Sequence, residues 1–364
     1  MKELVASAML EGAVGMSTGL TYTPAMYAQD DELIALCEVV ASFGGYYCPH
    51  HRNYGKLALE SYDGCIDVAR RSGVALHLAH ATLPFDVNRG RASELLQLLE
   101  RARADGMDIT LDSYPYAAAS TYLHSLLPGW VQRGGHAATI ERLRDLGIRE
   151  RIRSEVEDRG SDGFHGIPVD WSTITVSGVQ GSRNASWVGR SIEQAAASVG
   201  LEPFDAFIAL ILDEDLGASC ILDVGDEANV QAIMRDRRQM VGSDGILIGS
   251  RPHPRAWGTF PRILARYVRE LGLLTVEEAI KKMTSLPAER LGLTDRGILR
   301  EGAVADMVCF DAATVQDNAT YEDPRRYPSG IPFVIVNGRL VIDEGERTGD
   351  IPGRAIRRTS KSGR

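Results

Sequence analysis

A regular alternation of helical and strand-like patterns limits the folds open to this chain. Residues 31–43 have helical apolar spacing, GGYYCPHH is β-prone, residues 57–72 are helical again, and VALHLAH is typical of a short buried strand. Residues 91–105 predict a further helix before the strand-like run MDITLDSYPY. This βαβα order predicts a parallel sheet with helical crossovers. Polar residues follow each strand-like run, at the end of the sheet where parallel α/β folds place their active sites.

Composition narrows the class of protein and its compartment. Hydrophobic residues make up 44% of the 364 positions, enough for a large core, and a formal charge of −9 disfavours nucleic acid and anionic membranes as partners. Five scattered cysteines without a CxxC spacing fit a reducing compartment. The first fifteen residues favour an amphipathic helix over a signal peptide, and no run approaches the about 20 apolar residues of a membrane span. We therefore expect a soluble, cytoplasmic protein.

The later part of the chain departs from this alternation. Residues 121–238 contain a Gly/Asp-rich stretch, the strand-like run STITVSGV and helical patterns, and we interpret them as a large insertion between two barrel strands. MVGSDG follows as a candidate strand end. TVEEAIKKMTS has a capping-box pattern at Thr275 and Glu278, which predicts a helix. From residue 297, short β runs alternate with turn residues and predict a small β element.

Three residues at predicted strand ends suggest a metal centre. His50 and His80 end consecutive strands, and Asp244 ends a later one. In a closed barrel all three would point into one mouth, where imidazoles and a carboxylate can hold zinc and leave a position open for water. A single histidine on a strand is more often a structural residue, so this spacing is suggestive only. Three such residues at corresponding strand ends favour the metal site.

Six motifs occur in the order of one known family. They are EGAVGMSTGLTY, GGYYCPHHR, HLAHAT, DSYPYAAAST, VGSDG followed by RPHPRAWGTFPR, and TSLPAERLGLTDRGILREGAVADMVCFD. Together they resemble the N-acyl-D-amino-acid deacylase (D-aminoacylase) branch of the metal-dependent amidohydrolase superfamily, from the first residues to about residue 345. The resemblance implies an α/β fold: a partial TIM barrel with an insertion between late barrel strands and a small C-terminal β-sandwich element.

The resemblance also implies how the chain is divided. The expected regions are barrel strands four to seven in 1–120, the inserted α/β segment in 121–238, the last barrel strand and helices in 239–296, the β-sandwich element in 297–345, and a flexible tail in 346–364. The family's HxH strand, an early bridging ligand and the first three barrel strands have no counterpart here. We expect the C-terminal piece of a longer enzyme. One half of a split enzyme with a separate N-terminal half, and a non-catalytic remnant that binds a partner, stay open.

The site roles follow from the same resemblance. His50 and His80 match the zinc-binding histidines of the family, and Asp244 matches its general base and acid, which also contacts the metal. Tyr114, Ser120 and Arg255 match residues that hold the substrate carboxylate, a task that suits the guanidinium fork of arginine. The implied reaction is zinc-dependent hydrolysis of N-acyl-D-amino acids. The alternatives are another amide hydrolase of hydantoinase or dihydroorotase type, and an incompetent fragment that acts as a binding partner. A homo-oligomer is also open.

Two positions depart from the family pattern. Thr82 stands where the family has a lysine that helps to bind the carboxylate, and this loss of a cation shifts the expected substrate preference. Cys48 lies on the same strand face as His50, where we expect a buried, inert thiol. We expect His51 to be structural, since it points away from His50, and His77 to lie off the face of His80. We assign no role to His165.

Overall fold

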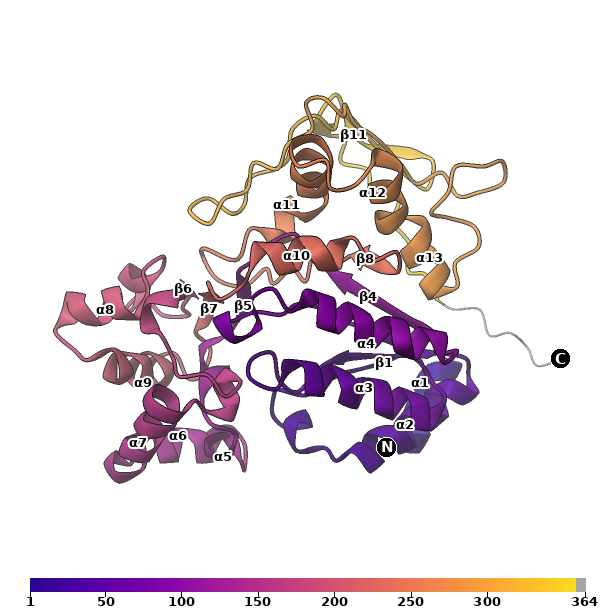
Figure 1. Cartoon of the computed structure of the whole chain (residues 1–364). Helices are drawn as coiled ribbons and strands as arrows, with labels where there is room; N and C mark the ends of the chain where they lie inside the picture. The colour runs from indigo at the N-terminus through magenta and orange to yellow at the C-terminus, as the bar shows by residue number, and fades with distance from the viewer. Residues whose placement is uncertain (358–364) are drawn as a thin grey trace.

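Five parallel strands form the central sheet of the computed structural model, which describes residues 1–357 (Figure 1). The strand order is β1-β2-β3-β4-β8, and all four pairings are parallel. The strands are β1 Gly15–Gly19, β2 Tyr46–His50, β3 Ala75–Leu78, β4 Ile109–Ser113 and β8 Gln239–Val241. The helices that alternate with them are α1 Lys2–Leu10, α2 Asp30–Ser42, α3 Ala58–Ser72, α4 Ala92–Ala104 and α10 Glu227–Met234. The predicted α/β fold, a partial TIM barrel, is confirmed.

The helices form where the sequence has both an apolar face and suitable ends. Three acidic residues occupy the first turn of α2, where they interact favourably with the helix dipole. Helix α3 ends at Gly73, whose φ of 70° is the left-handed conformation that glycine adopts most easily. The buried faces of these helices join the strands in one apolar cluster that includes Val40, Ile66 and Leu95. This core fixes the carboxyl ends of β2 and β3, at or just beyond which the two candidate histidines lie.

The insertion is a second layer of structure beside the sheet, drawn in magenta in Figure 1. Its antiparallel sheet has the order β5-β7-β6, with strands β5 Ala119–Tyr122, β6 Ile174–Gly178 and β7 Ser219–Leu222. Its helices are α5 Gly129–Gln132, α6 His136–Arg144, α7 Leu146–Arg153, α8 Ile192–Val199 and α9 Pro203–Asp213. These elements enclose a separate apolar core. The sheet begins at Ala119, two residues before the predicted start of the insertion.

Within residues 1–357 no single helix is long and apolar enough to cross a bilayer. Helices α8 and α9 reach that length and composition only as a pair, bent by 93° at the break between them. Phe204, Phe207 and Ile211 of α9 are buried in the core of the insertion. The apolar character of this pair is therefore explained by packing within the protein.

The C-terminal region contains helices and a small antiparallel sheet, orange to yellow in Figure 1. The helices are α11 Arg255–Arg262, α12 Val276–Met283 and α13 Ser285–Leu291, and the predicted capping box at Thr275 and Glu278 is present. The sheet has the order β12-β11-β10-β9, with β9 Met307–Cys309, β10 Phe333–Val336, β11 Arg339–Asp343 and β12 Glu346–Arg347. The predicted small C-terminal β element is confirmed. Residues 358–364 of the predicted flexible tail lie outside the described residues.

Short helical turns connect the longer elements. The 3-10 turns are η1 Ala25–Tyr27, η2 Asp86–Asn88, η3 Leu123–Leu126, η5 Asp162–Phe164, η6 Trp171–Thr173 and η7 Ala185–Trp187. Two π-helical segments, η4 Ser154–Arg159 and η8 Ile263–Glu270, continue α7 and α11. Two of these turns, η3 and η5, carry residues of the insertion that line the candidate site.

A buried ion pair fixes β8 beside β4. The guanidinium of Arg103 on α4 donates to both carboxylate oxygens of Asp236, at 2.7 and 3.2 Å, and the two side chains are 6% and 5% exposed. We expect Asp236→Ala to lower the free energy of unfolding by about 3–5 kcal/mol, because it leaves a buried guanidinium without its main partner. Urea unfolding measures the change. Arg237→Ala, which removes only the exposed pair between Arg237 and Glu100, should cost less than about 1 kcal/mol. Equal losses in the two variants would contradict the prediction.

Candidate active site

A pocket of about 220 Å³ opens at the carboxyl end of the parallel sheet, between the sheet and the insertion. Its walls come from the segments after β1, β2, β3, β4 and β8 and from β5, η3 and the turn after η5 of the insertion. All six residues predicted from the sequence line it: His50, His80, Tyr114, Ser120, Asp244 and Arg255. The structure therefore brings the whole predicted set to one place, from positions spread over about 200 residues of sequence.

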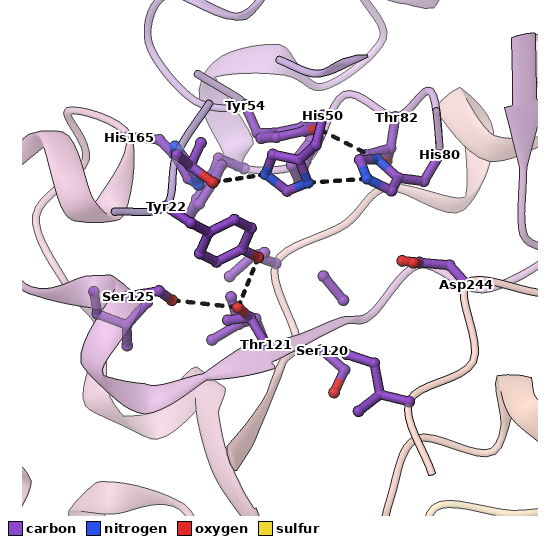
Figure 2. Close-up of a pocket in the computed structure, with 18 of the residues that line it drawn as sticks. Tyr22, His50, Tyr54, His80, Thr82, Ser120, Thr121, Ser125, His165 and Asp244 are labelled. Carbon is purple, nitrogen blue, oxygen red and sulfur yellow. Dashed lines mark hydrogen bonds between the residues drawn. The ribbon is translucent and has the colours of Figure 1, made fainter. Parts of the chain in front are cut away.

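The imidazole rings of the two candidate histidines lie next to each other in the pocket (Figure 2). His50 is the last residue of β2, and His80 lies two residues beyond the end of β3. His50 Nδ1 and His80 Nε2 are 2.9 Å apart, and the ring planes cross at 77°. Burial, followed by the nearby His80, His51 and His165, holds the pKa of His50 well below its usual range. His50 is therefore a neutral imidazole, the form that binds metals.

The backbone at His80 is held in a strained conformation. Its φ is 33°, in the left-handed region that residues with a Cβ seldom adopt. Its N–H donates to Asp112 Oδ1 at 2.9 Å, and the other oxygen of Asp112 is 2.9 Å from His77 Nε2. Burial raises the pKa of Asp112, but the hydrogen bond and charge of His77 outweigh it and leave the pKa lowered. An ionised Asp112 therefore fixes the turn that carries His80.

Strain of this kind recurs around the pocket. Four of its lining residues without glycine's freedom have positive φ: His80, Phe85, His165 and Asp244. Each such residue costs on the order of 1–3 kcal/mol, and these conformations concentrate at functional sites. The turns after β3 and β8 thus hold the side chains of His80 and Asp244 in the pocket at a cost in backbone strain.

Asp244 and Arg255 form an ion pair in the opposite wall. Arg255 is the first residue of α11 and is only 1% exposed, and its Nη2 lies 2.8 Å from Asp244 Oδ2. The guanidinium also lies over the Tyr114 ring, 4.5 Å from its centre. Burial raises the pKa of Tyr114 to about 12, and the charge of Arg255 opposes this rise. Figure 2 shows the Asp244 carboxylate directed into the pocket, below the imidazoles as drawn.

His253 holds the start of α11 in place. The N–H of Arg255 donates to His253 Nδ1 at 3.0 Å, and His253 Nε2 donates to the Ala118 carbonyl at 3.0 Å. Burial holds the pKa of His253 well below its usual range, which fits this neutral tautomer. His253, within the RPHPR motif, therefore acts in the turn that positions Arg255.

The insertion supplies a wall that the sequence patterns gave no reason to expect. His165 lies in the pocket, and burial lowers its pKa to about 4. Its carbonyl accepts the Lys56 N–H at 3.0 Å, and a Cβ at Gly55 would lie 2.6 Å from the same oxygen. Only a glycine allows this close approach. Tyr54, whose ring centre is 5.4 Å from that of His165, also lines the pocket and was missed, because no local pattern relates the two.

The other singled-out residues lie outside the pocket, except Thr82, which lines it. Cys48 is a half-buried free thiol whose pKa is raised to about 12 by burial, as expected of an inert cysteine. His51 is fully buried between the rings of Tyr54 and Tyr62, which fits the expected structural role. His77 pairs with Asp112.

The histidine pair is suited to part of a zinc site. Structural and catalytic zinc ions take about four ligands in a tetrahedral arrangement, and imidazoles are preferred ligands. Among residues 1–357, no three His, Cys, Asp or Glu side chains converge closely enough to hold an ion together. His50 and His80 therefore fit zinc as two of its ligands. Asp244 faces the same pocket while paired with Arg255, and its predicted contact with the metal stays a prediction.

Comparison with known proteins identifies a consistent set of relatives. The chain matches the model of the Amidohydrolase family over residues 1–342. It is 37% identical over 358 residues to the N-acyl-D-glutamate deacylase of Alcaligenes xylosoxydans xylosoxydans, covering 98% of this chain and 64% of the relative. The D-aminoacylase of that organism is 35% identical over 363 residues, covering 99% and 64%. The chain thus spans about 64% of the length of these curated relatives.

A solved structure agrees with the sequence matches. It is the crystal structure of N-acyl-D-glutamate deacylase from Bordetella bronchiseptica, complexed with zinc and a phosphonate inhibitor that mimics the tetrahedral intermediate of its reaction. The TM-score is 0.77 at 33% identity, over 93% of this chain and 62% of that one. The resemblance inferred from the sequence motifs is confirmed.

Proposed function

This chain belongs to the amidohydrolase family, and we propose that it hydrolyses the amide bond of N-acyl-D-amino acids to a carboxylate and a free D-amino acid. The observation that carries this proposal is the single pocket in which two imidazoles, a carboxylate and a buried guanidinium meet. Relatives named for deacylation of N-acyl-D-amino acids match almost the whole chain. The similarity of sequence and the content of the pocket support the same chemistry.

In this proposal His50 and His80 hold a zinc ion, with Asp244 beside it. When bound, the metal supplies a Lewis acid that polarises the acyl carbonyl of the substrate. Asp244 takes a proton from the water that attacks this carbonyl and delivers it to the leaving nitrogen. A C–O bond forms, the amide C–N bond breaks, and the proton leaves on the amine. The directed carboxylate of Asp244 and the strained turn that carries it support this assignment.

Arg255 and Tyr114 bind the α-carboxylate of the substrate in this proposal, and Ser120 lies in the same pocket. The bond to His253 fixes the backbone of Arg255, and the Tyr114 ring and Asp244 hold its guanidinium, so little conformational entropy is lost when it pairs with a carboxylate. The Ser120 hydroxyl donates its one proton to the Cys220 carbonyl at 3.1 Å. In this arrangement it has no proton to donate to a carboxylate. Arg255 is therefore the main anchor, and Ser120 shapes the pocket beside it.

Charge in the pocket limits the substrate side chain. Within residues 1–357, Arg255 is the only lysine or arginine in the lining, and it is already paired with Asp244. Much of the remaining wall is apolar: Pro84, Phe85, Leu126, Leu222 and Val224. A second carboxylate would be buried without a cation. We therefore propose N-acyl-D-amino acids with neutral side chains as substrates.

A substrate panel tests both proposals. We expect kcat/KM for N-acetyl-D-leucine to exceed that for N-acetyl-D-glutamate by at least about 100-fold, since an unpaired buried carboxylate costs about 3 kcal/mol or more. Steady-state kinetics with zinc-loaded protein measures the ratio, and N-acetyl-L-leucine is the control for stereochemistry. A chelator should abolish turnover, and added zinc should restore it. Equal rates on leucine and glutamate substrates would refute the side-chain proposal. Absence of both zinc binding and turnover would refute the deacylase proposal.

A further inference from the structure

The outer nitrogens of the two candidate ligands each face a hydroxyl group. His50 presents Nδ1 and His80 presents Nε2 toward their shared point, 2.9 Å apart. The opposite nitrogen of His50, Nε2, lies 2.7 Å from Thr21 Oγ1. The opposite nitrogen of His80, Nδ1, lies 3.2 Å from the Tyr54 hydroxyl. Each imidazole is thus bound on its far side by one hydroxyl.

This arrangement accommodates the tautomers that a shared metal ion requires, because each hydroxyl can accept a hydrogen bond from the ring nitrogen beside it. A neutral imidazole carries one N–H and one lone pair, and only the lone pair can bind a metal. When Nε2 of His50 donates to Thr21, the lone pair of His50 is on Nδ1. When Nδ1 of His80 donates to Tyr54, the lone pair of His80 is on Nε2. These are the two nitrogens that already face each other.

Both hydroxyls are themselves held in place. Thr21 follows β1, and the N–H of the preceding Leu20 donates to the His50 carbonyl at 2.9 Å, which ties this turn to β2. Tyr54 is 6% exposed, and its ring lies 3.8 Å from that of His51, centre to centre. Its carbonyl accepts the side-chain N–H of Asn88 at 3.0 Å. The backbone that carries Thr21 and the ring that carries the Tyr54 hydroxyl are therefore held beside the two histidines.

We infer that Thr21 and Tyr54 are positioning residues, whose hydroxyls orient His50 and His80 so that Nδ1 of one and Nε2 of the other bind a single metal ion. Hydrogen bonds to the far nitrogen of a metal-bound histidine orient the ring, and their removal commonly weakens metal affinity by about 10- to 100-fold. The inference rests on the metal site of the proposed function. It adds residues that contact the ligands and do not contact the metal.

Zinc affinity tests the inference without reference to turnover. Thr21→Val and Tyr54→Phe remove each hydroxyl and keep nearly the same shape, and we expect each to weaken zinc binding by about 10- to 100-fold. Competition with a chromophoric chelator measures the affinity of the full chain. The absorption spectrum of bound Co²⁺ gives a second readout, because it reports ligand geometry. Thr21→Ser keeps a hydroxyl and should restore most of the affinity.

The chain offers matched controls on β1 and β2, the strands that precede Thr21 and Tyr54. Thr18 and Tyr47 hydrogen-bond to each other at 2.7 Å and lie outside the pocket, so Thr18→Val and Tyr47→Phe delete the same groups elsewhere. Their zinc affinities should stay within about threefold of the parent. His50→Ala and His80→Ala should lose the ion.

The outcomes separate the two ideas. Unchanged zinc affinity and Co²⁺ spectra in Thr21→Val and Tyr54→Phe, with zinc lost in the histidine variants, would overturn the positioning role and leave the metal site standing. A parent protein that binds no zinc would overturn the metal site, and the positioning role with it. Equal weakening in the Thr18 and Tyr47 controls would also overturn the positioning role, because the effect would then be a general loss of packing.

Discussion

Replacing Asp244 by asparagine should lower kcat for N-acetyl-D-leucine by about 100- to 10,000-fold, the usual contribution of a general acid–base group. Asparagine keeps the shape of the side chain but cannot take a proton from the attacking water. Zinc should remain bound, since His50 and His80 are unchanged. The measurements are kcat on the zinc-loaded variant and its zinc content. Near-normal turnover in the variant would show that another group moves the proton.

The variant also breaks an ion pair, and this effect needs separation from the loss of a base. Arg255 is buried and lies 2.8 Å from Asp244, so Asp244→Asn should reduce stability as well as rate. Circular dichroism and urea unfolding show whether the variant is folded at the assay temperature. A substitution of Arg255 breaks the same pair from the other side, and thus serves as the matched comparison.

Replacing Arg255 by methionine should lower kcat/KM for N-acetyl-D-leucine by about 100-fold or more, mainly through KM. Removal of one partner from a buried charged hydrogen bond costs about 2–5 kcal/mol. The discriminating substrate is N-acetyl-3-methylbutylamine, which lacks the carboxylate. For this amide, the parent and the variant should differ by less than about tenfold. Arg255→Lys keeps the charge and loses the planar fork, so we expect only partial recovery.

The two variants should therefore change different kinetic parameters. Asp244→Asn acts on kcat, and Arg255→Met acts on KM for substrates that carry a carboxylate. An equal effect of Arg255→Met on both substrates would mean that the guanidinium supports Asp244 rather than binding the substrate. The same result in both variants would point to the ion pair itself as the important feature.

The sequence was a good guide where a pattern is local. Helices α2, α3 and α4 begin and end within a residue or two of their predicted ranges, because apolar spacing and terminal residues determine them. The ends of β2 and β3 followed from the same alternation, and with them the approximate positions of His50 and His80. Asp244 was placed at the end of a later strand-like run, Tyr114, Ser120 and Arg255 came from motif resemblance, and the structure gathers all four in the same pocket.

Other features of the site depend on contacts between distant segments and left no local trace. The hydroxyl partners Thr21 and Tyr54 lie in turns that have no periodicity to interpret. His165 reaches the pocket because the insertion docks on Gly55, more than 100 residues earlier. The pairing of Asp244 with Arg255 depends on the turn between β8 and α11. Tertiary packing determines each of these, and a single sequence does not reveal it.

The docking of the insertion on the sheet has an evolutionary consequence. His50, His80 and Asp244 follow the parallel strands, whereas Leu126, His165 and Leu222 in the facing wall are encoded within the insertion. Mutations in the insertion can therefore reshape the volume available to a substrate while the reactive groups keep their geometry. Under the proposed function, the residues that set substrate preference and those that carry the chemistry lie on separate stretches of the sequence, so one set can change while the other is kept.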